Sequence, residues 1–328
     1  GYGWYMGRRS IRQNQKRQSK KLSRDYFTGL NFLLSNESDK AVDLFITMLD
    51  VDDETIDTHL SLGSLFRKRG EVDRSIRIHQ NLIARPSLTT EQRDIAMMEL
   101  GKDYLAAGFY DRAEEIFLNL VSQDDHSEEA ETQLISIYQV TKEWQNAINI
   151  TKGLSRKRQQ ALKSITAHFY CQLADEATDT ADKIKLLQQG IKLDDKCGRA
   201  WLTLAKIYTN QTSLCKKAIF ELKLADIELF SDAIGIARQV YRDSNDLENY
   251  QSLLQQALES GAGASVIIAL AQHKIEQGHT KNAEKMVLDH LYRNPTMKGF
   301  QHLMQLHIKQ AEDGQAKQRL SMLEKLVE

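Results

Sequence analysis

The sequence holds very little proline and little glycine. Two prolines, Pro86 and Pro295, and 17 glycines are spread over 328 residues. Strand-rich proteins need turn residues about every 8–12 positions, and this chain lacks them. Leu, Ala, Gln, Glu, Lys and Arg, which are good helix formers, outnumber Val, Ile and Tyr. The composition therefore predicts an all-α fold.

Long apolar runs and a strong net charge are also missing. The sequence has no stretch of about 18 apolar residues, so it contains no complete membrane span. The formal net charge is −1. Residues 1–24 hold eight Lys or Arg and no acid, so this segment carries +8 and the remainder carries −9. A mildly acidic body argues against nucleic acid as a partner.

Cysteine is scarce as well. Cys171, Cys197 and Cys215 show no Cys-x-x-Cys spacing. An odd and sparse set indicates reduced thiols in a cytosolic compartment rather than a disulfide framework. One interpretation is a reactive thiol. The interpretation that base rates favour is a set of small buried hydrophobic residues.

A helical repeat is the strongest pattern that is present. Its clearest copy reads Leu100-Gly101-x-x-Tyr104, followed by Ala113 and Phe117. This spacing resembles the 34-residue tetratricopeptide repeat, which is a helix–turn–helix unit. Partial copies are Gly29, Phe32, Ala41 and Phe45; Leu62, Gly63, Phe66, Ser75 and His79, with His79 in the place of Phe; Leu134, Ile135, Tyr138 and Ala147; Trp201, Leu204, Ala205 and Tyr208; and Leu270, Ala271, Gly278 and Ala283.

The period of the small residues predicts the architecture. Ala41, Ser75, Ala113 and Ala147 are 34, 38 and 34 residues apart. We predict a tetratricopeptide-repeat solenoid of about nine helical hairpins over residues 22–328, with a separate basic segment at 1–21. The Gly or Ala of each first helix should face the Ala or Ser of the second, and neighbouring hairpins should cover each other's apolar faces. The alternative, a helical bundle without repeats, is disfavoured by three units that match at several positions. Within residues 160–195 and within residues 230–260 the repeat pattern is degraded, but the sequence is still helical in character.

Motifs that would carry chemistry are incomplete. The histidines of His273-x-x-Glu276-x-x-His279 are six residues apart, whereas zinc proteases place them four apart, so solvated polar residues are the favoured interpretation. The acidic run 50–54 resembles the start of a calcium loop, but Ser61 stands where that loop needs Glu. A solenoid also offers an open groove, whereas catalysis needs a rigid site that excludes water. We therefore expect no enzyme, no catalytic residue, no metal site and no cofactor in this chain.

A docking strip is predicted on the concave side of the solenoid, which the first helices should line. Its mixed basic and apolar side chains suit a segment of a partner protein, and the alternative is a solvated face with scattered charge. The strip consists of Leu60, Arg67, Lys68, Met98, Lys102 and Leu105. A clamp for acidic chaperone tails is not expected, because its Asn positions hold Leu30, Ser64, Lys102 and Ser136.

The first ten residues have the features of a membrane boundary. Trp4 and Tyr5 are aromatic residues that suit the interface, and Arg8 and Arg9 follow on what would be the cytoplasmic side. The basic run that follows would lie along anionic headgroups, and each basic residue near the surface would contribute about 1 kcal/mol of attraction. The alternative is a disordered basic arm or residues left over from the vector used to express the protein.

Several stretches together resemble the lipopolysaccharide assembly protein B family. They extend over the whole chain, and the resemblance is far more specific than that of a bare repeat. They are Tyr2-Gly3-Trp4-Tyr5-Met6-Gly7-Arg8-Arg9-Ser10, Leu22–Tyr26, Asn31–Asn36, Lys40–Phe45, Arg69–Arg74, Tyr110–Glu114, Ala167–Cys171 and Pro295–Met297.

The resemblance implies a single-pass protein of the bacterial inner membrane with its repeats on the cytoplasmic side. Members act as adaptors that help a membrane-bound ATP-dependent zinc protease degrade the deacetylase of the lipid A pathway. A membrane partner that senses lipopolysaccharide relieves this control. Full-length members add a membrane helix before the repeats and a four-cysteine rubredoxin-like knuckle, which holds zinc or iron, after them. We expect this chain to be a fragment that lacks most of the anchor and the knuckle.

Two other functions stay open at this stage. The first is a soluble peptide-binding co-chaperone of the tetratricopeptide class, which would need neither anchor nor lipid. The second is an enzyme with a hidden site, which a specific bound metal or cofactor would reveal. The sequence also allows a homodimer and does not decide which face holds which partner.

Overall fold

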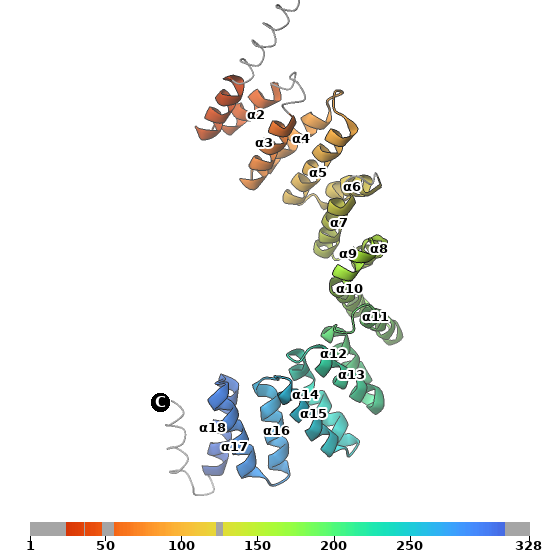
Figure 1. Cartoon of the computed structure of the whole chain (residues 1–328), viewed down its shortest axis with the longest axis vertical. Coiled ribbons are helices and arrows are strands. Elements are labelled where there is room, and N and C mark those ends of the chain that lie inside the picture. Colours follow the sequence, from red (N-terminus) through yellow and green to blue (C-terminus); the bar gives the residue numbers. More distant parts are fainter. Residues whose placement is uncertain (1–23, 36, 48–55, 123–126, 312–328) are drawn as a thin grey trace, which may run out of the picture. The chain divides into compact units, whose positions relative to one another are not determined.

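The computed structural model describes residues 24–35, 37–47, 56–122 and 127–311 (Figure 1). Within these ranges the regular elements are α-helices and short 3₁₀-helices, and no strand is present. The prediction of an all-α repeat fold is confirmed. The predicted basic segment 1–21 and its boundary lie outside the described residues, as do the acidic run 50–54 and the end of the chain after residue 311.

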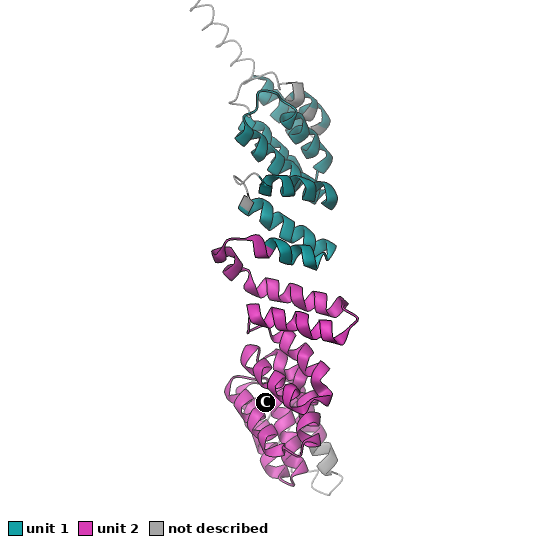
Figure 2. Cartoon of the chain, turned by 90° about the vertical axis from the view of Figure 1, so that its right-hand side faces the viewer, with its two compact units in different colours: residues 1–150 teal, residues 151–328 magenta. Residues whose placement is uncertain are grey.

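The chain divides into two compact units, Gly1–Ile150 and Thr151–Glu328 (Figure 2). The first unit begins with a helix over residues 24–34. It continues with α2 (Ser38–Thr47), α3 (Ile56–Lys68), α4 (Val72–Ile83), α5 (Thr90–Ala106), α6 (Tyr110–Ser122), α7 (Ser127–Thr141) and most of α8 (Trp144–Gly153).

The second unit continues the same alternation of first and second helices. Its elements are α9 (Arg156–Ala161), α10 (Lys163–Glu176), α11 (Thr180–Leu193), α12 (Gly198–Ile207), η3 (Tyr208–Asn210), α13 (Thr212–Ala225), η4 (Leu229–Ala233), α14 (Ile234–Asp243), α15 (Leu247–Glu259), α16 (Ala264–Glu276), α17 (Thr280–Arg293) and α18 (Met297–Ala311). Successive helices pack side by side as hairpins, such as α3 with α4, α10 with α11 and α16 with α17. Their order agrees with the predicted series of hairpins.

The turns inside the hairpins share one backbone geometry. Gly70 and Gly108 have φ angles of 79° and 77°, in the left-handed region that glycine adopts without steric cost. The next residue then donates its N–H to a carbonyl in the last turn of the first helix, as Phe109 does to Tyr104 at 2.8 Å. Lys142 occupies the same turn position between α7 and α8 with φ of 62°, so the turn of this hairpin forms without glycine.

A ring packed over a glycine holds the best-defined hairpins together. A Cβ atom added at Gly101 would lie 2.6 Å from the ring of Phe117, and one added at Gly63 would lie 2.3 Å from the ring of His79. We predicted that each Gly faces the small residue of the second helix. The structure also places the ring of the second helix against the glycine. At Gly63 the predicted small residue is close as well, because the hydroxyl of Ser75 lies 2.7 Å from the Gly63 carbonyl oxygen.

The degraded stretch at 160–195 is a regular hairpin, α10 with α11, that follows the extra short helix α9. Its closest helix approach is inverted relative to the repeat pattern. The glycine, Gly190, lies on the second helix, and an added Cβ atom would lie 3.1 Å from the carbonyl oxygen of Ala167 on the first. Because the small residues have exchanged helices, the spacing of the repeat does not reveal this unit.

We predict that Gly101→Ala destabilises the first unit. The added methyl group collides with the Phe117 ring. Overpacking costs typically about 1–3 kcal/mol, and the better helix propensity of Ala returns up to about 1 kcal/mol. We expect a net loss of about 1–2 kcal/mol in the free energy of unfolding, measured by chemical denaturation with circular dichroism.

Gly235→Ala is the matched control for this substitution. Gly235 is an exposed helical glycine of α14, and a Cβ atom added there would meet nothing within 4 Å. It should leave the stability unchanged or raise it. Equal effects of the two substitutions would contradict the role assigned to the ring.

Candidate functional site

The predicted docking strip maps to two neighbouring first helices. Leu60, Arg67 and Lys68 belong to α3, and the other three residues belong to α5, which packs against it. A groove of about 400 Å³ lies on this face. It is lined by Leu60, Ser61, Ser64, Leu65, Lys68, Ile95 and Glu99. The two helices thus do build one continuous surface.

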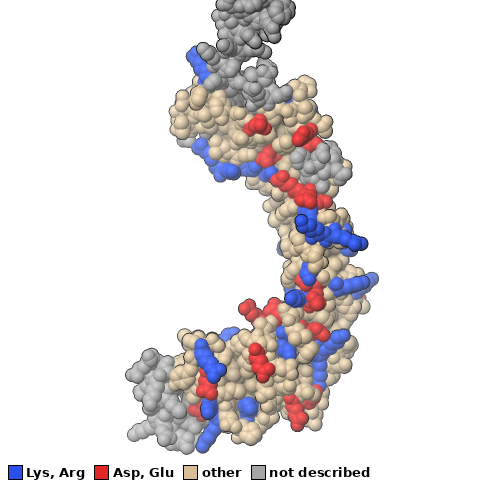
Figure 3. Space-filling model, in the orientation of Figure 1, with Lys and Arg blue, Asp and Glu red and all other residues tan. Residues whose placement is uncertain are grey.

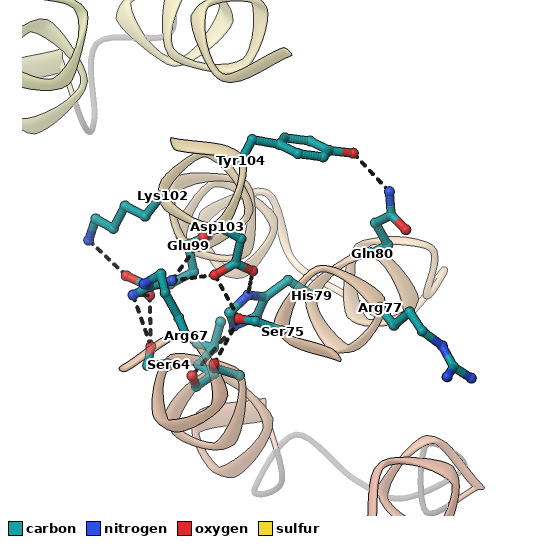
Figure 4. Close-up of polar contacts among 12 residues, drawn as sticks. Ser64, Arg67, Ser75, Arg77, His79, Gln80, Glu99, Lys102, Asp103 and Tyr104 are labelled. Carbon is teal, nitrogen blue, oxygen red and sulfur yellow. Dashed lines mark hydrogen bonds and ion pairs between the residues drawn. The ribbon is translucent and has the colours of Figure 1, made fainter. Parts of the chain in front are cut away.

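Arg67 lies at the centre of an ion-pair cluster rather than free in the groove (Figure 4). Its two terminal nitrogens each lie 2.6 Å from a carboxylate oxygen, one of Glu99 and one of Asp103. Burial alone would lower the pKa of Arg67, but hydrogen bonds and the attraction of both carboxylates raise it above the ordinary value. The charge of Arg67 is therefore compensated within the protein.

Glu99 collects several donors at the edge of the groove. Lys102 Nζ lies 2.7 Å from one of its oxygens, and Ser64 Oγ donates to the other at 2.8 Å. Burial would raise the pKa of Glu99, but hydrogen bonds from Lys102, Arg67 and Ser64 outweigh it and lower the pKa to about 2. Lys102 also pairs with Glu129 of α7 at 2.7 Å, so this lysine links successive hairpins.

Asp103 forms the buried end of the same cluster. Its side chain has no exposed surface, and neither has that of His79, whose Nδ1 lies 2.5 Å from the second Asp103 oxygen. Ser75 Oγ lies 2.7 Å from Asp103 Oδ1. Removing one partner from such a buried cluster leaves an unpaired charge, which costs about 3–5 kcal/mol. The histidine in the place of the repeat's Phe thus ties α4 to α5.

A tyrosine contact recurs beside this cluster with the period of the repeat. Gln80 of α4 donates its amide N–H to the Tyr104 hydroxyl at 2.8 Å. One hairpin later the Tyr138 hydroxyl donates to Glu114 of α6 at 2.6 Å. Each pair is 24 residues apart, so the Tyr of one hairpin is bonded to the second helix of the hairpin before it. The sequence pattern contained the Tyr but not its partner.

The exposure of the predicted strip is uneven. Met98 is 3% exposed and offers almost no surface to a partner. Leu60 and Leu105 are half-buried, and Lys68 is exposed. Exposed aliphatic surface comes in addition from Leu65, which lies outside the predicted strip and is 43% exposed. Around the groove the surface is therefore aliphatic and hydroxylic, with Lys68 as an exposed cation.

Charges of both signs are interspersed on the face that Figure 3 shows. Trp4, Tyr5, Arg8 and Arg9, which we predicted to lie at the membrane, are outside the described residues. None of the helices described is long and apolar enough to cross a membrane.

Two sets of chemically reactive residue types lie in the second unit, one around His273 and one of cysteines. His273 is 3% exposed, and its ring meets that of Tyr250 edge-on at 5.6 Å, so the prediction of a solvated side chain is wrong for this residue. Burial lowers its pKa. All three cysteines are buried, as the favoured interpretation predicted. The sulfurs of Cys171 and Cys197 are 3.7 Å apart, which sequence spacing did not indicate.

Acid should destabilise the first unit through Glu99. Because its pKa in the folded protein is about 2, against an ordinary value of 4.5, its contribution to stability is complete above pH 4.5 and is lost as the pH falls towards 2. We expect Glu99→Gln to lower the free energy of unfolding at pH 7 by up to about 3 kcal/mol and to flatten its decline in acid. Urea denaturation from pH 7 to pH 2 measures both effects.

The control is Glu115→Gln, which changes an exposed carboxylate of α6. This variant should follow the parent protein over the whole pH range. If Glu99→Gln also follows it, the cluster does not stabilise the fold.

The comparisons with known proteins agree with the repeat pattern. A family model described as tetratricopeptide repeat matches residues 58–92, the hairpin that holds Arg67 and His79. The chain is 41% identical to lipopolysaccharide assembly protein B of Escherichia coli (strain K12), over 99% of this chain and 85% of that protein. It is 38% identical to the protein of the same name from Haemophilus influenzae, with the same coverage.

Two solved structures are similar at low sequence identity. One is a tetratricopeptide repeat protein from Parabacteroides merdae, with 13% identity, a TM-score of 0.37 and coverage of 77% of this chain and 98% of that one. The other is the C-terminal part of a TPR repeat-containing protein from Cytophaga hutchinsonii, with 11% identity, a TM-score of 0.42 and coverage of 85% and 99%.

Proposed function

Because the chain belongs to the lipopolysaccharide assembly protein B family, we propose that it is a non-enzymatic tetratricopeptide scaffold that regulates lipopolysaccharide synthesis at the bacterial inner membrane. The observation that carries this proposal is the identity of 38–41% to relatives of that name over 99% of the chain. The open groove on α3 and α5 supports it, since it suits a segment of another protein.

The proposed mechanism is tethering. The scaffold holds the deacetylase of the lipid A pathway beside a membrane-bound ATP-dependent zinc protease. Placing both on one support raises their effective concentration without any new chemistry. A membrane partner that senses lipopolysaccharide would release this control. These partners come from the family resemblance, and the exposed helical faces supply the surface that such an adaptor needs.

We place the repeats on the cytoplasmic side of the inner membrane, with a single span as the anchor. The order of residues near the start supports this placement. Trp4 and Tyr5 precede Arg8 and Arg9, as expected where a span leaves the bilayer towards the cytoplasm. The basic residues that follow would hold the first hairpins close to anionic headgroups.

The groove on α3 and α5 is the proposed docking site for a partner segment. Leu60, Leu65 and Ile95 offer apolar contact, and the hydroxyls of Ser61 and Ser64 can bond a partner's backbone. Arg67 and Lys102 are engaged by carboxylates of the protein itself. This arrangement disfavours the co-chaperone alternative, because a clamp for an acidic tail needs basic residues that are free to bind it.

Reconstitution tests the function directly. The protease and the deacetylase would be placed in vesicles of inner-membrane lipids, with and without the full-length scaffold, and the remaining deacetylase would be followed over time. We expect faster degradation when the scaffold is present. If the scaffold binds neither protein and leaves the rate unchanged, the proposal fails.

Lys68→Glu should weaken the capture of a partner by about five- to tenfold, which corresponds to about 1 kcal/mol for a charge at the rim of an interface. Affinity for the protease and for the deacetylase would be measured in separate experiments, with the partner immobilised on a sensor surface and binding of the scaffold recorded. Reversal of Arg67 is a poor test, because it would leave Glu99 and Asp103 without their partner and impair folding.

Lys217→Glu is the matched control, since Lys217 is an exposed lysine on the second helix α13. It should leave both affinities unchanged. Equal affinities for Lys68→Glu and the parent protein would remove this groove from the binding surface.

A further inference from the structure

Three side chains that favour soft metals converge in the second unit. Cys171 lies on α10, and Cys197 is the residue immediately before α12. His168 precedes Cys171 by three residues on α10, so both side chains lie on the same face of the helix. The two sulfurs and one imidazole nitrogen all lie within 4.8 Å of one another. Cys197 follows Cys171 by 26 residues and His168 by 29, at the start of the next hairpin, so packing between hairpins brings it to the other two.

The spacing of the sulfurs matches that of a tetrahedral metal centre. Zinc bonds thiolate sulfur at about 2.3 Å, and the tetrahedral angle then separates two sulfurs by about 3.8 Å. The Cys171 and Cys197 sulfurs are 3.7 Å apart. A disulfide would need them at about 2.05 Å. From this geometry we propose that His168, Cys171 and Cys197 bind one zinc ion.

The donor set and its surroundings fit such a site. Thiolate and imidazole are ligands that zinc prefers, and two cysteines with one histidine leave a fourth position for water or an outside ligand. Cys171 and Cys197 are 1% and 3% exposed, whereas His168 is exposed. The ion can therefore enter from the side of His168 while the thiolates are protected from solvent.

Binding would convert two S–H bonds into two Zn–S bonds, and both protons would leave to solvent. The two thiolates then balance the charge of the Zn²⁺ ion. Because one sulfur belongs to α10 and the other to the start of α12, the ion would link two successive hairpins of the second unit. This site lies inside the repeats and is separate from the four-cysteine knuckle that the family resemblance implies. The proposal differs from our sequence-based expectation of no metal site, and the experiment below decides between them.

Cobalt(II) is a suitable probe, because tetrahedral thiolate sites give it a sulfur-to-metal charge-transfer band and intense visible bands. The full chain would be reduced with a reductant that contains no thiol and then freed of metal. It would be titrated with Co²⁺, and afterwards with Zn²⁺ to displace the cobalt. We expect one equivalent of Co²⁺ to bind, and Zn²⁺ to remove its colour. The chain has only three cysteines, so the variants assign the site without ambiguity.

Cys215→Ser is the matched control, since Cys215 is buried but outside the cluster. It should keep the cobalt spectrum. Cys171→Ser and Cys197→Ser should abolish the charge-transfer band. His168→Gln changes an exposed side chain and should fold normally. Loss of a residue that only hydrogen-bonds a metal ligand lowers metal affinity about tenfold to hundredfold. His168→Gln removes a ligand itself and should lower the affinity for Co²⁺ by more than that.

Three results would overturn the proposal. The first is that the reduced parent protein takes up no Co²⁺ or Zn²⁺. The second is a cobalt spectrum that is the same in His168→Gln and Cys197→Ser as in the parent. The third is a purified protein lighter by two hydrogens, restored by reductant, that still binds no metal after reduction. This last result would show that the two cysteines form a reversible disulfide instead.

Discussion

The close approach of two helices within each hairpin is the constraint on which the rest of the structure depends. Gly101 lets the Phe117 ring lie against the backbone of the first helix, and Gly63 does the same for His79. Apolar side chains of successive hairpins then pack together, as Leu33 and Ala41 of the first hairpin do with Leu62, Phe66 and Ile78 of the second. A single hairpin cannot cover its apolar surface, so each hairpin is stable only beside the next. The groove on α3 and α5 exists because these first helices are neighbours.

The second hairpin departs from the repeat at one position, and the departure changes the chemistry of its interface. With His79 in the place of Phe, the buried ring needs a polar partner, and Asp103 of the next hairpin supplies it. Asp103 in turn needs compensation and is paired with Arg67. A cluster of this kind adds little net stability compared with apolar packing. Its charges do require one register between the hairpins, because any shift would leave a carboxylate buried and unpaired.

This pairing also shapes what the groove offers to other proteins. Side chains that look available in the sequence, such as Arg67 and Lys102, are used to join hairpins. What faces outward is mainly aliphatic and hydroxylic surface with Lys68 at its edge. Such a surface suits recognition of a short segment by shape and backbone bonding rather than by strong charge.

The sequence by itself determined the all-α class, the period of the hairpins, the position of their turns and the family. Each of these follows from local composition and from small and aromatic residues that recur within one hairpin, as Gly101, Tyr104 and Phe117 do. Only the tertiary structure decided which side chains meet between hairpins. Met98 is buried, Arg67 is paired with Asp103, and Cys171 lies against Cys197. These outcomes depend on the register in which one hairpin packs on the next, and no spacing along the chain specifies that register.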